Sequence, residues 1–319
     1  MKILITGITG LFGSYLAKEF FEEGEIHGLK RPKSNTDQLG ALAEKIIWHN
    51  GDINDFQSLE EAFEGMDLII HSAGLVSFDN KDRESLLKVN HEGTTNVVNV
   101  MLDQGIKKII HVSSVAAIGR DPEQRLIGED HKWVDSPWNT PYSISKYYSE
   151  LEVWRGVQEG LEAIVLNPSI LLAKMNERSS STGLYEYVQK ENSFYPLGDI
   201  NYIDVRDAAK ISLELFQKGH WGERFILNNK STTYQMFFKE MAAVMEKKAP
   251  NIPIKDSMIP LASLLSKIAG LFGKKGIVNK QTSRLAQQQI RFDNTKIKSV
   301  LNPQFSELKE TFKWALNEK

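Results

Sequence analysis

Strand-like and helix-like segments alternate along the first half of this chain, and this rhythm limits the fold more than any other feature. Short apolar, β-branched runs are each followed by a stretch whose apolar residues have helical spacing. Such alternation predicts βαβ units, whose strands form a parallel sheet covered by helices on both faces. The right-handed crossover rule then favours an α/β fold with a doubly wound parallel Rossmann sheet. The expected strands are residues 2–6, 25–29, 45–50, 66–74, 107–114 and 161–169.

The alternation weakens after Pro168. Residues 171–199 show no clear βα repeat, and "NYIDVRDAAKISLELF" then restores one strand and one helix. A chain of 319 residues is long enough for a main domain with a smaller companion. We therefore expect a Rossmann domain at residues 1–168, with residues 200–227 returning to it. A smaller, mostly helical C-terminal substrate lobe would comprise residues 169–199 and 228–319.

Composition excludes several classes of function. The net charge is -2, so no global basic field indicates a nucleic-acid partner. There is no cysteine, which excludes disulfides and thiolate sites, and the histidines are scattered without ligand-like spacing, so we expect no metal site. No apolar run approaches the ~20 residues of a membrane span, and the first run is too short for a signal peptide. We expect a cytoplasmic protein.

The first strand runs into three glycines, Gly7, Gly10 and Gly13, in the pattern G-x-x-G-x-x-G. A strand, a glycine turn and a helix are the context of a dinucleotide site, where backbone N–H groups approach a pyrophosphate. The alternative is a tight turn that binds nothing. The second strand ends with Lys30, Arg31 and Lys33 rather than the carboxylate typical of an NAD site. These cations favour NADP(H) over NAD(H), unless they form only a solvated basic loop.

Two further strand ends contribute polar or small residues. Asp52 in "NGDIND" could accept a hydrogen bond from an adenine amino group, or it could be a helix cap. The small residues of "HSAGL" would let a cofactor pass close to the backbone.

Tyr142 and Lys146 in "YSISK" lie four residues apart on one face of a predicted helix. A nearby lysine cation would stabilise the tyrosine phenolate and lower its pKa, so that the tyrosine could exchange a proton with a substrate oxygen. The alternative is an ordinary amphipathic helix. Ser113 and Ser114 end the fifth strand, where a hydroxyl could bind a reacting oxygen or cap the strand. Asn90 could hold a water or a carbonyl under this site, or lie on a helix surface.

Taken in order, "TGITGLFG", "HSAG", "VNHEGTTNVV", "HVSSVAAIG", "YSISK" and "YIDVRDAA" resemble the extended short-chain dehydrogenase/reductase family, also called the NAD-dependent epimerase/dehydratase family. The resemblance implies NAD(P) at the glycine turn and a catalytic Ser–Tyr–Lys set. That set maps onto Ser114, Tyr142 and Lys146, since the family places its active hydroxyl five residues before the glycine that matches Gly119. It also implies that Asn90 supports the site and that Asp52 meets the adenine.

The cofactor contacts expected from the glycine turn, the strand ends and this resemblance form one set. Its members are Gly7, Thr9, Gly10, Leu11, Phe12, Gly13, Lys30, Arg31, Asp52, Ile53, Ser72, Ala73, Gly74, Tyr142, Lys146, Asn167, Pro168 and Ser169.

The expected function is an NAD(P)(H)-dependent oxidoreductase that acts on a carbonyl or hydroxyl carbon. "VLNPSILL" and the helical tail resemble the dihydroflavonol-reductase-like branch, and residues 176–199 hold only Arg178, which disfavours a sugar nucleotide. The alternatives are a nucleotide-sugar epimerase or dehydratase with a retained cofactor, and a non-catalytic NADP(H) sensor. A homodimer is a family expectation. Residues 260–276 are amphipathic and predict a lid or lobe helix, with docking on a membrane surface as the alternative.

Overall fold

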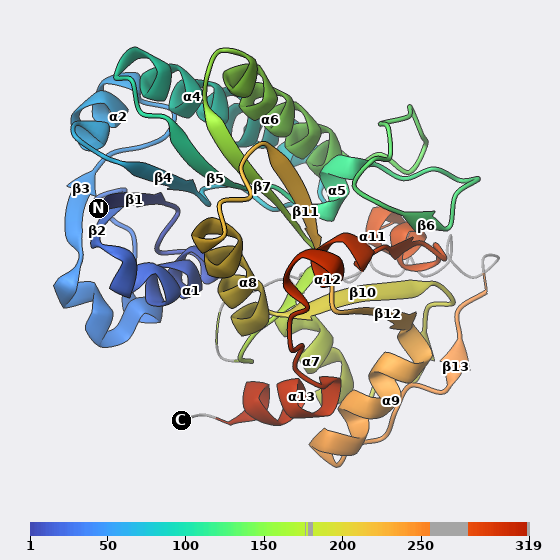
Figure 1. Ribbon diagram of the computed structural model, residues 1–319. Coiled ribbons are helices and arrows are strands. Elements are labelled where there is room, and N and C mark those ends of the chain that lie inside the picture. The colour runs from blue at the N-terminus through green and yellow to red at the C-terminus, as the bar shows by residue number, and fades with distance from the viewer. Residues whose placement is uncertain (176, 178–180, 256–279, 318–319) are drawn as a thin grey trace.

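The computed structural model describes residues 1–175, 177, 181–255 and 280–317. Within these residues, the larger sheet has seven strands in the order β11-β7-β5-β4-β1-β2-β3, all of them parallel (Figure 1). This order confirms the predicted doubly wound Rossmann sheet. The strands are β1 (Lys2–Thr6), β2 (Glu25–Lys30), β3 (Ile47–Asn50), β4 (Leu68–His71), β5 (Lys108–Val112), β7 (Glu162–Pro168) and β11 (Glu223–Leu227).

Helices cover both faces of this sheet because the side chains of each buried strand alternate between two apolar layers. Ile3 and Ile5 of β1 belong to the core beneath α1 and α8, whereas Leu4 belongs to the core beneath α2, α4 and α6. The helical segments here are α1 (Leu11–Glu19), η1 (Phe20–Glu23), η2 (Asp37–Lys45), α2 (Phe56–Phe63), η3 (Asn80–Asp82), α3 (Arg83–Leu86), η4 (Leu87–Glu92), α4 (Gly93–Asp103), α5 (Val115–Ile118), α6 (Pro141–Gln158), α8 (Val205–Gln217) and α12 (Thr295–Leu301).

A smaller sheet lies beyond the carboxyl ends of the large one, in the order β12-β10-β8. Its core is shared with three helices, α7 (Thr182–Gln189), α9 (Tyr234–Met245) and α13 (Leu308–Leu316). The C-terminal part therefore carries strands as well as the predicted helices. Its remaining elements are β8 (Ile170–Leu172), β10 (Asp199–Asp204), β12 (Lys230–Thr233), the pair β9 (Phe194–Tyr195) and β13 (Ile252–Pro253), α11 (Lys280–Ala286) and β14 (Arg291–Phe292). The last of these, β14, pairs with β6 (Leu126–Ile127) of the N-terminal half.

The predicted return of residues 200–227 to the Rossmann sheet applies only to part of that range. Contrary to the expectation, β10 pairs with β8 and β12 in the smaller sheet, whereas α8 packs on the large sheet and β11 forms its edge. The reason lies at Pro168: β7 ends there, and Ser169 donates its N–H to the Leu227 carbonyl oxygen at 3.0 Å before the chain enters β8. The bend gives β10 a partner outside the large sheet.

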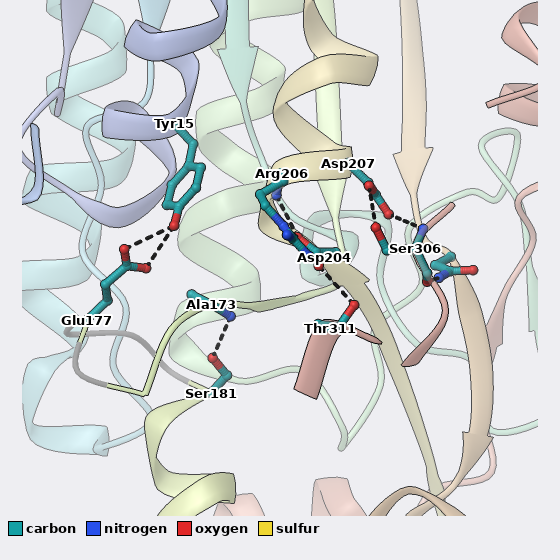
Figure 2. Close-up of polar contacts among 10 residues, drawn as sticks. Tyr15, Ala173, Glu177, Ser181, Asp204, Arg206, Asp207, Ser306 and Thr311 are labelled. Atoms are coloured by element: carbon teal, nitrogen blue, oxygen red, sulfur yellow. Dashed lines mark hydrogen bonds and ion pairs between the residues drawn. The ribbon is translucent and has the colours of Figure 1, made fainter. Parts of the chain in front are cut away.

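Polar contacts of the "YIDVRDAA" segment hold the C-terminal segment against α8 (Figure 2). Asp204 caps α8, pairs with Arg206 at 2.5 Å and accepts a hydrogen bond from the Thr311 hydroxyl at 2.9 Å. Asp207 accepts a hydrogen bond from the Ser306 N–H at 2.6 Å. These contacts attach residues that lie about a hundred positions later in the chain, with separations of 107 and 99.

Tyr15 of α1 links the Rossmann part to the segment that follows β8. Its hydroxyl donates to the Glu177 carboxylate, with distances of 3.0 and 3.2 Å to the two oxygens (Figure 2). Arg178 and the amphipathic segment 260–276 lie outside the described residues.

Candidate active site

The glycine turn follows β1, at the point of the larger sheet where the strand order reverses between the neighbouring strands β1 and β4. Gly7 has φ +67°, and a Cβ on it would come within 2.5 Å of the Ala73 backbone nitrogen. A Cβ on Gly13 would lie 2.3 Å from the Gly7 carbonyl oxygen. Only glycine therefore allows β1, α1 and the loop after β4 to approach this closely.

Gly10 differs from the other two glycines because its missing side chain faces open space. A Cβ there would meet one protein atom, the Gly7 carbonyl oxygen, at 3.1 Å. Gly10 is exposed and immediately precedes α1, whose first N–H groups point toward the turn. This arrangement is a backbone cradle that fits the pyrophosphate of a dinucleotide.

A cavity of about 1050 Å³ extends from this cradle along the carboxyl ends of the strands. Ser114, Tyr142 and Lys146 line it together with the glycines, although they come from a strand end and a helix far along the chain. The predicted residues that line this cavity are Gly7, Gly10, Leu11, Phe12, Gly13, Ser72, Gly74, Ser114, Tyr142, Lys146, Pro168 and Ser169.

Tyr142 lies in the first turn of α6, which starts sharply. Thr140 and Ser143 form a reciprocal capping box, and Pro141 occupies the first helical position. The tyrosine ring is 8% exposed and contacts Phe78 edge-on at 5.8 Å between ring centroids. Burial raises the pKa of the Tyr142 hydroxyl, and a hydrogen bond with Ser114 opposes that shift.

The sequence predicted that Lys146 lowers the pKa of Tyr142, and in this structure the net shift is upward instead. Lys146 lies one helical turn further on, but its ammonium group donates to the Val112 carbonyl oxygen at 2.9 Å. Burial also lowers the pKa of Lys146 itself to about 8, an effect that the Glu150 carboxylate opposes. Desolvation is therefore the largest contribution to the pKa shifts of both Tyr142 and Lys146.

A buried ammonium with a lowered pKa destabilises the fold. Below about pH 8 the folded and unfolded states are both protonated, so the penalty is fully present; it is relieved as pH rises from about 8 toward the ordinary value of 10.5. We predict that Lys146→Met raises the free energy of unfolding at pH 7 by about 1–3 kcal/mol, since one pKa unit corresponds to about 1.4 kcal/mol and the lost hydrogen bond offsets about 1 kcal/mol. Urea unfolding of the cofactor-free protein measures this, and the gain should shrink above pH 8. A loss of stability in Lys146→Met would contradict it.

The two serines of the fifth strand end have different environments. Ser113 is buried at the cavity wall, and its hydroxyl is committed to the Glu150 carboxylate, to which it donates at 2.7 Å. Ser114 caps the short helix α5, accepting from the Ala116 N–H at 3.1 Å, and its hydroxyl contacts Tyr142. Asn167 supports this strand end by donating to the Ser114 carbonyl oxygen at 3.0 Å.

Asn90 is buried beneath the site rather than lying on a helix surface. Its side-chain oxygen accepts from the Leu75 N–H at 2.7 Å, and its side-chain nitrogen donates to the Leu75 carbonyl oxygen and the Ser145 hydroxyl, both at 2.9 Å. The residue lies in η4, a short π-helical segment, and such segments recur at functional sites. Asn90 therefore ties the loop after β4 to α6.

Several predicted residues lie outside the lining of this cavity. Asp52 makes a local turn, accepting from the Asn54 N–H at 3.0 Å. The N-cap position of α2 is occupied by Asp55, whose side chain makes no capping hydrogen bond. Arg31 is exposed, and the Lys30 ammonium lies 5.4 Å from the centroid of the Trp48 ring. The predicted residues absent from the lining are Thr9, Lys30, Arg31, Asp52, Ile53, Ala73, Asn90 and Asn167.

The cavity also has lining residues that the sequence analysis missed. Arg120 directly follows Gly119 in "HVSSVAAIGR", so a cation next to the family motif was the available signal. Tyr234 and Gln288 come from the C-terminal part, where no periodic pattern marked them. Along the part of the chain that the structure describes, no group of His, Asp and Glu is arranged to hold a metal ion, and no helix is long and apolar enough to cross a membrane.

Comparisons with known proteins agree with this geometry. The model of the "NAD dependent epimerase/dehydratase family" matches residues 3–227. A Synechocystis sp. protein named "Putative dihydroflavonol 4-reductase" is 28% identical over 317 residues, covering 96% of this chain and 91% of that protein. The crystal structure of gox2253 has a TM-score of 0.82 at 27% identity, covering 98% and 96% of the two chains.

A more distant likeness concerns the fold. The structure of the Thermotoga maritima UDP-glucose 4-epimerase with UDP-glucose has a TM-score of 0.77 at 19% identity, covering 99% and 97% of the two chains. The motifs, the sheet order and the matched family model agree, and this chain belongs to the NAD-dependent epimerase/dehydratase family, among the extended short-chain dehydrogenases/reductases.

Proposed function

We propose that this protein is an NADP(H)-dependent reductase or dehydrogenase that interconverts a carbonyl group and an alcohol. The observation that carries the proposal is that Ser114, Tyr142 and Lys146 line the same cavity as the glycine cradle. When bound, the nicotinamide would supply or accept the hydride. The likeness to the dihydroflavonol 4-reductase relative over 96% of the chain supports a reductase.

In this proposal the three side chains have separate roles. The Tyr142 hydroxyl gives a proton to the substrate oxygen during reduction and takes it back during oxidation. The raised pKa of Tyr142 keeps the phenol protonated at neutral pH, which suits proton donation. The Ser114 hydroxyl orients the substrate oxygen, and Lys146, held by the Val112 carbonyl, lies one helical turn from Tyr142, where its remaining N–H groups can hold a ribose.

The supporting residues Asn90 and Asn167 are positioning residues in this account. Asn90 fixes the loop that carries Gly74, where a Cβ would lie 3.2 Å from both the Asn90 side-chain oxygen and the Lys146 ammonium. Asn167 fixes the backbone of Ser114. Neither side chain lines the cavity, so both act through their neighbours.

The cofactor preference can be tested at the end of β2. Arg31 is exposed, and it makes no ion pair with any residue that the structure describes, which leaves its fork available for a 2′-phosphate. We predict that Arg31→Glu weakens NADPH binding by about 10–100-fold and changes NADH binding little, because a hydrogen bond to a charged group contributes about 1.5–3 kcal/mol. Titration by nicotinamide fluorescence measures both constants. Lys107→Glu, at the opposite end of the strands, is the control, and equal losses for the two cofactors would contradict the preference.

The second candidate is a nucleotide-sugar epimerase or dehydratase, which the family model and the fold likeness to an epimerase favour. Such an enzyme reoxidises its cofactor within each cycle, whereas a reductase consumes NADPH. The test is to mix the purified protein and NADPH with a panel of aldehydes and ketones, and separately with UDP- and dTDP-sugars. We expect loss of nicotinamide absorbance with a carbonyl compound. Sugar conversion without NADPH loss, by protein that retains its cofactor, would favour the second candidate.

A further inference from the structure

Arg120 is a charged side chain in the cavity to which the proposed chemistry gives no role. Gly119, immediately before it, has φ +94°, and a Cβ there would lie 3.2 Å from the Trp133 ring, so the backbone that aims Arg120 needs glycine. One turn of helix, α5, separates Arg120 from Ser114 at its other end. Arg120 thus enters the cavity from the same segment as the proposed catalytic serine.

No carboxylate among the described residues forms an ion pair with Arg120. The other partly buried arginines of that part of the chain are paired: Arg155 with Glu152, Arg206 with Asp204 and Arg224 with Glu150. A desolvated guanidinium without a counter-ion is costly, since a buried charge needs a partner. Burial lowers the pKa of Arg120 to about 10, which still leaves it protonated at neutral pH.

The acidic side chains in the described lining of the cavity already have other partners. Asp199 pairs with Arg291 at 3.0 Å, and Glu177 accepts hydrogen bonds from Tyr15. Lys146 is held by the Val112 carbonyl. Arg120 is therefore a positive charge that the cavity lining, as far as the structure describes it, leaves unbalanced.

Gln288 independently indicates that the cavity suits a polar ligand. The residue is 8% exposed and lines the same cavity, and both its amide nitrogen and its amide oxygen are buried without a hydrogen-bond partner among the residues that the structure describes. Buried polar atoms of this kind are rare in native proteins and need an explanation. Tyr234 adds a hydroxyl to the same lining.

We propose that the substrate carries a carboxylate, which Arg120 binds, with Gln288 and Tyr234 as polar neighbours in the cavity. This inference rests on the proposed function, since it specifies the substrate class of the same site: a carbonyl compound with an acidic group. A carboxylate matches the planar guanidinium fork and balances a single positive charge. A diphosphate carries more than one negative charge, whereas Arg120 is the one cation of the described lining that neither a carboxylate nor a carbonyl oxygen holds.

The test is a binding measurement that does not require turnover. The NADPH-saturated protein is titrated calorimetrically with benzoate, with its neutral analogue benzamide, and with UDP. We expect benzoate to bind and Arg120→Gln to weaken it by about 10–100-fold, because a charge-assisted hydrogen bond contributes about 1.5–3 kcal/mol. Arg120→Lys should restore part of the affinity, and Arg125→Gln, an exposed arginine nearby in the sequence, should have no effect.

The melting temperature and the NADPH affinity of Arg120→Gln test the inference independently of benzoate binding. Arg120→Gln removes a partly buried charge that has no ion pair among the described residues, so its melting temperature without ligand should equal or exceed that of the wild type, and its NADPH affinity should be unchanged. Benzoate binding that is unaffected by Arg120→Gln, or a dependence on Arg120 that appears with UDP alone, would overturn the carboxylate assignment. If Tyr142 proves dispensable while benzoate still depends on Arg120, the proposed function fails and the anion site stands.

Discussion

Replacing Tyr142 with phenylalanine is expected to lower kcat by about 10²–10⁴-fold, the usual contribution of a positioned general acid or base. Phenylalanine retains the buried ring and its contact with Phe78, so the fold and the cavity should persist. NADPH affinity should fall far less than kcat, because the variant keeps the glycine cradle and loses a single hydroxyl. Steady-state rates at the nicotinamide absorbance band and an NADPH titration measure the two effects separately.

Tyr147→Phe is the matched control for this experiment. Tyr147 lies on the same helix and stacks on Trp133 with ring centroids 4.3 Å apart, but it does not line the cavity. Its hydroxyl should therefore be dispensable for turnover. Full activity in Tyr142→Phe would remove the tyrosine from the mechanism, whatever the control shows.

The second large effect is expected at Gly10. A valine there would keep the turn, since its Cβ meets only the Gly7 carbonyl oxygen, but its methyl groups would occupy the cradle. We expect NADPH affinity to fall by about 100-fold or more, because the contacts that valine would block in the proposed cradle would be charge-assisted hydrogen bonds of about 1.5–3 kcal/mol each. The melting temperature should change little. Calorimetric titration with NADPH and thermal unfolding provide the two measurements.

Gly13→Ala separates binding from folding at the same turn. Its Cβ would lie 2.3 Å from the Gly7 carbonyl oxygen and 2.9 Å from the Ile8 Cα, so α1 would have to move from β1. This variant should lose stability as well as affinity. For Gly10→Val, a melting temperature and an NADPH affinity that both equal those of the wild type would contradict the cradle assignment.

The large sheet could be predicted because each of its buried strands appears in the sequence as an apolar run, and each crossover helix appears as apolar residues with helical spacing. Residues 2–6 and β1 coincide for this reason. The smaller sheet was not predictable in the same way, because β8 and β12 have only three and four residues and neither contains a run of buried apolar side chains. The position of β10 follows from the bend after Pro168, which is a property of the assembled chain.

The candidate site shows a similar division. Gly7 and Gly13 could be recognised from their spacing in the sequence. The structure explains that spacing, because a Cβ at either position would collide with the neighbouring backbone. The direction of the Tyr142 pKa shift could not be predicted from the sequence. The four-residue spacing places Lys146 on the same helix face, but it does not fix where the ammonium group points. Arg120 was missed because its unpaired state depends on which carboxylates the fold assigns to other partners.

The most direct test of the account is to follow the hydride itself. The protein is incubated with NADPH that carries deuterium at both C4 positions of the nicotinamide and with a carbonyl compound that the screen identifies. The product is then analysed by mass spectrometry. The account predicts an alcohol with one deuterium on the former carbonyl carbon and an equal amount of NADP⁺. A converted substrate that contains no deuterium, with NADPH unconsumed, would contradict it.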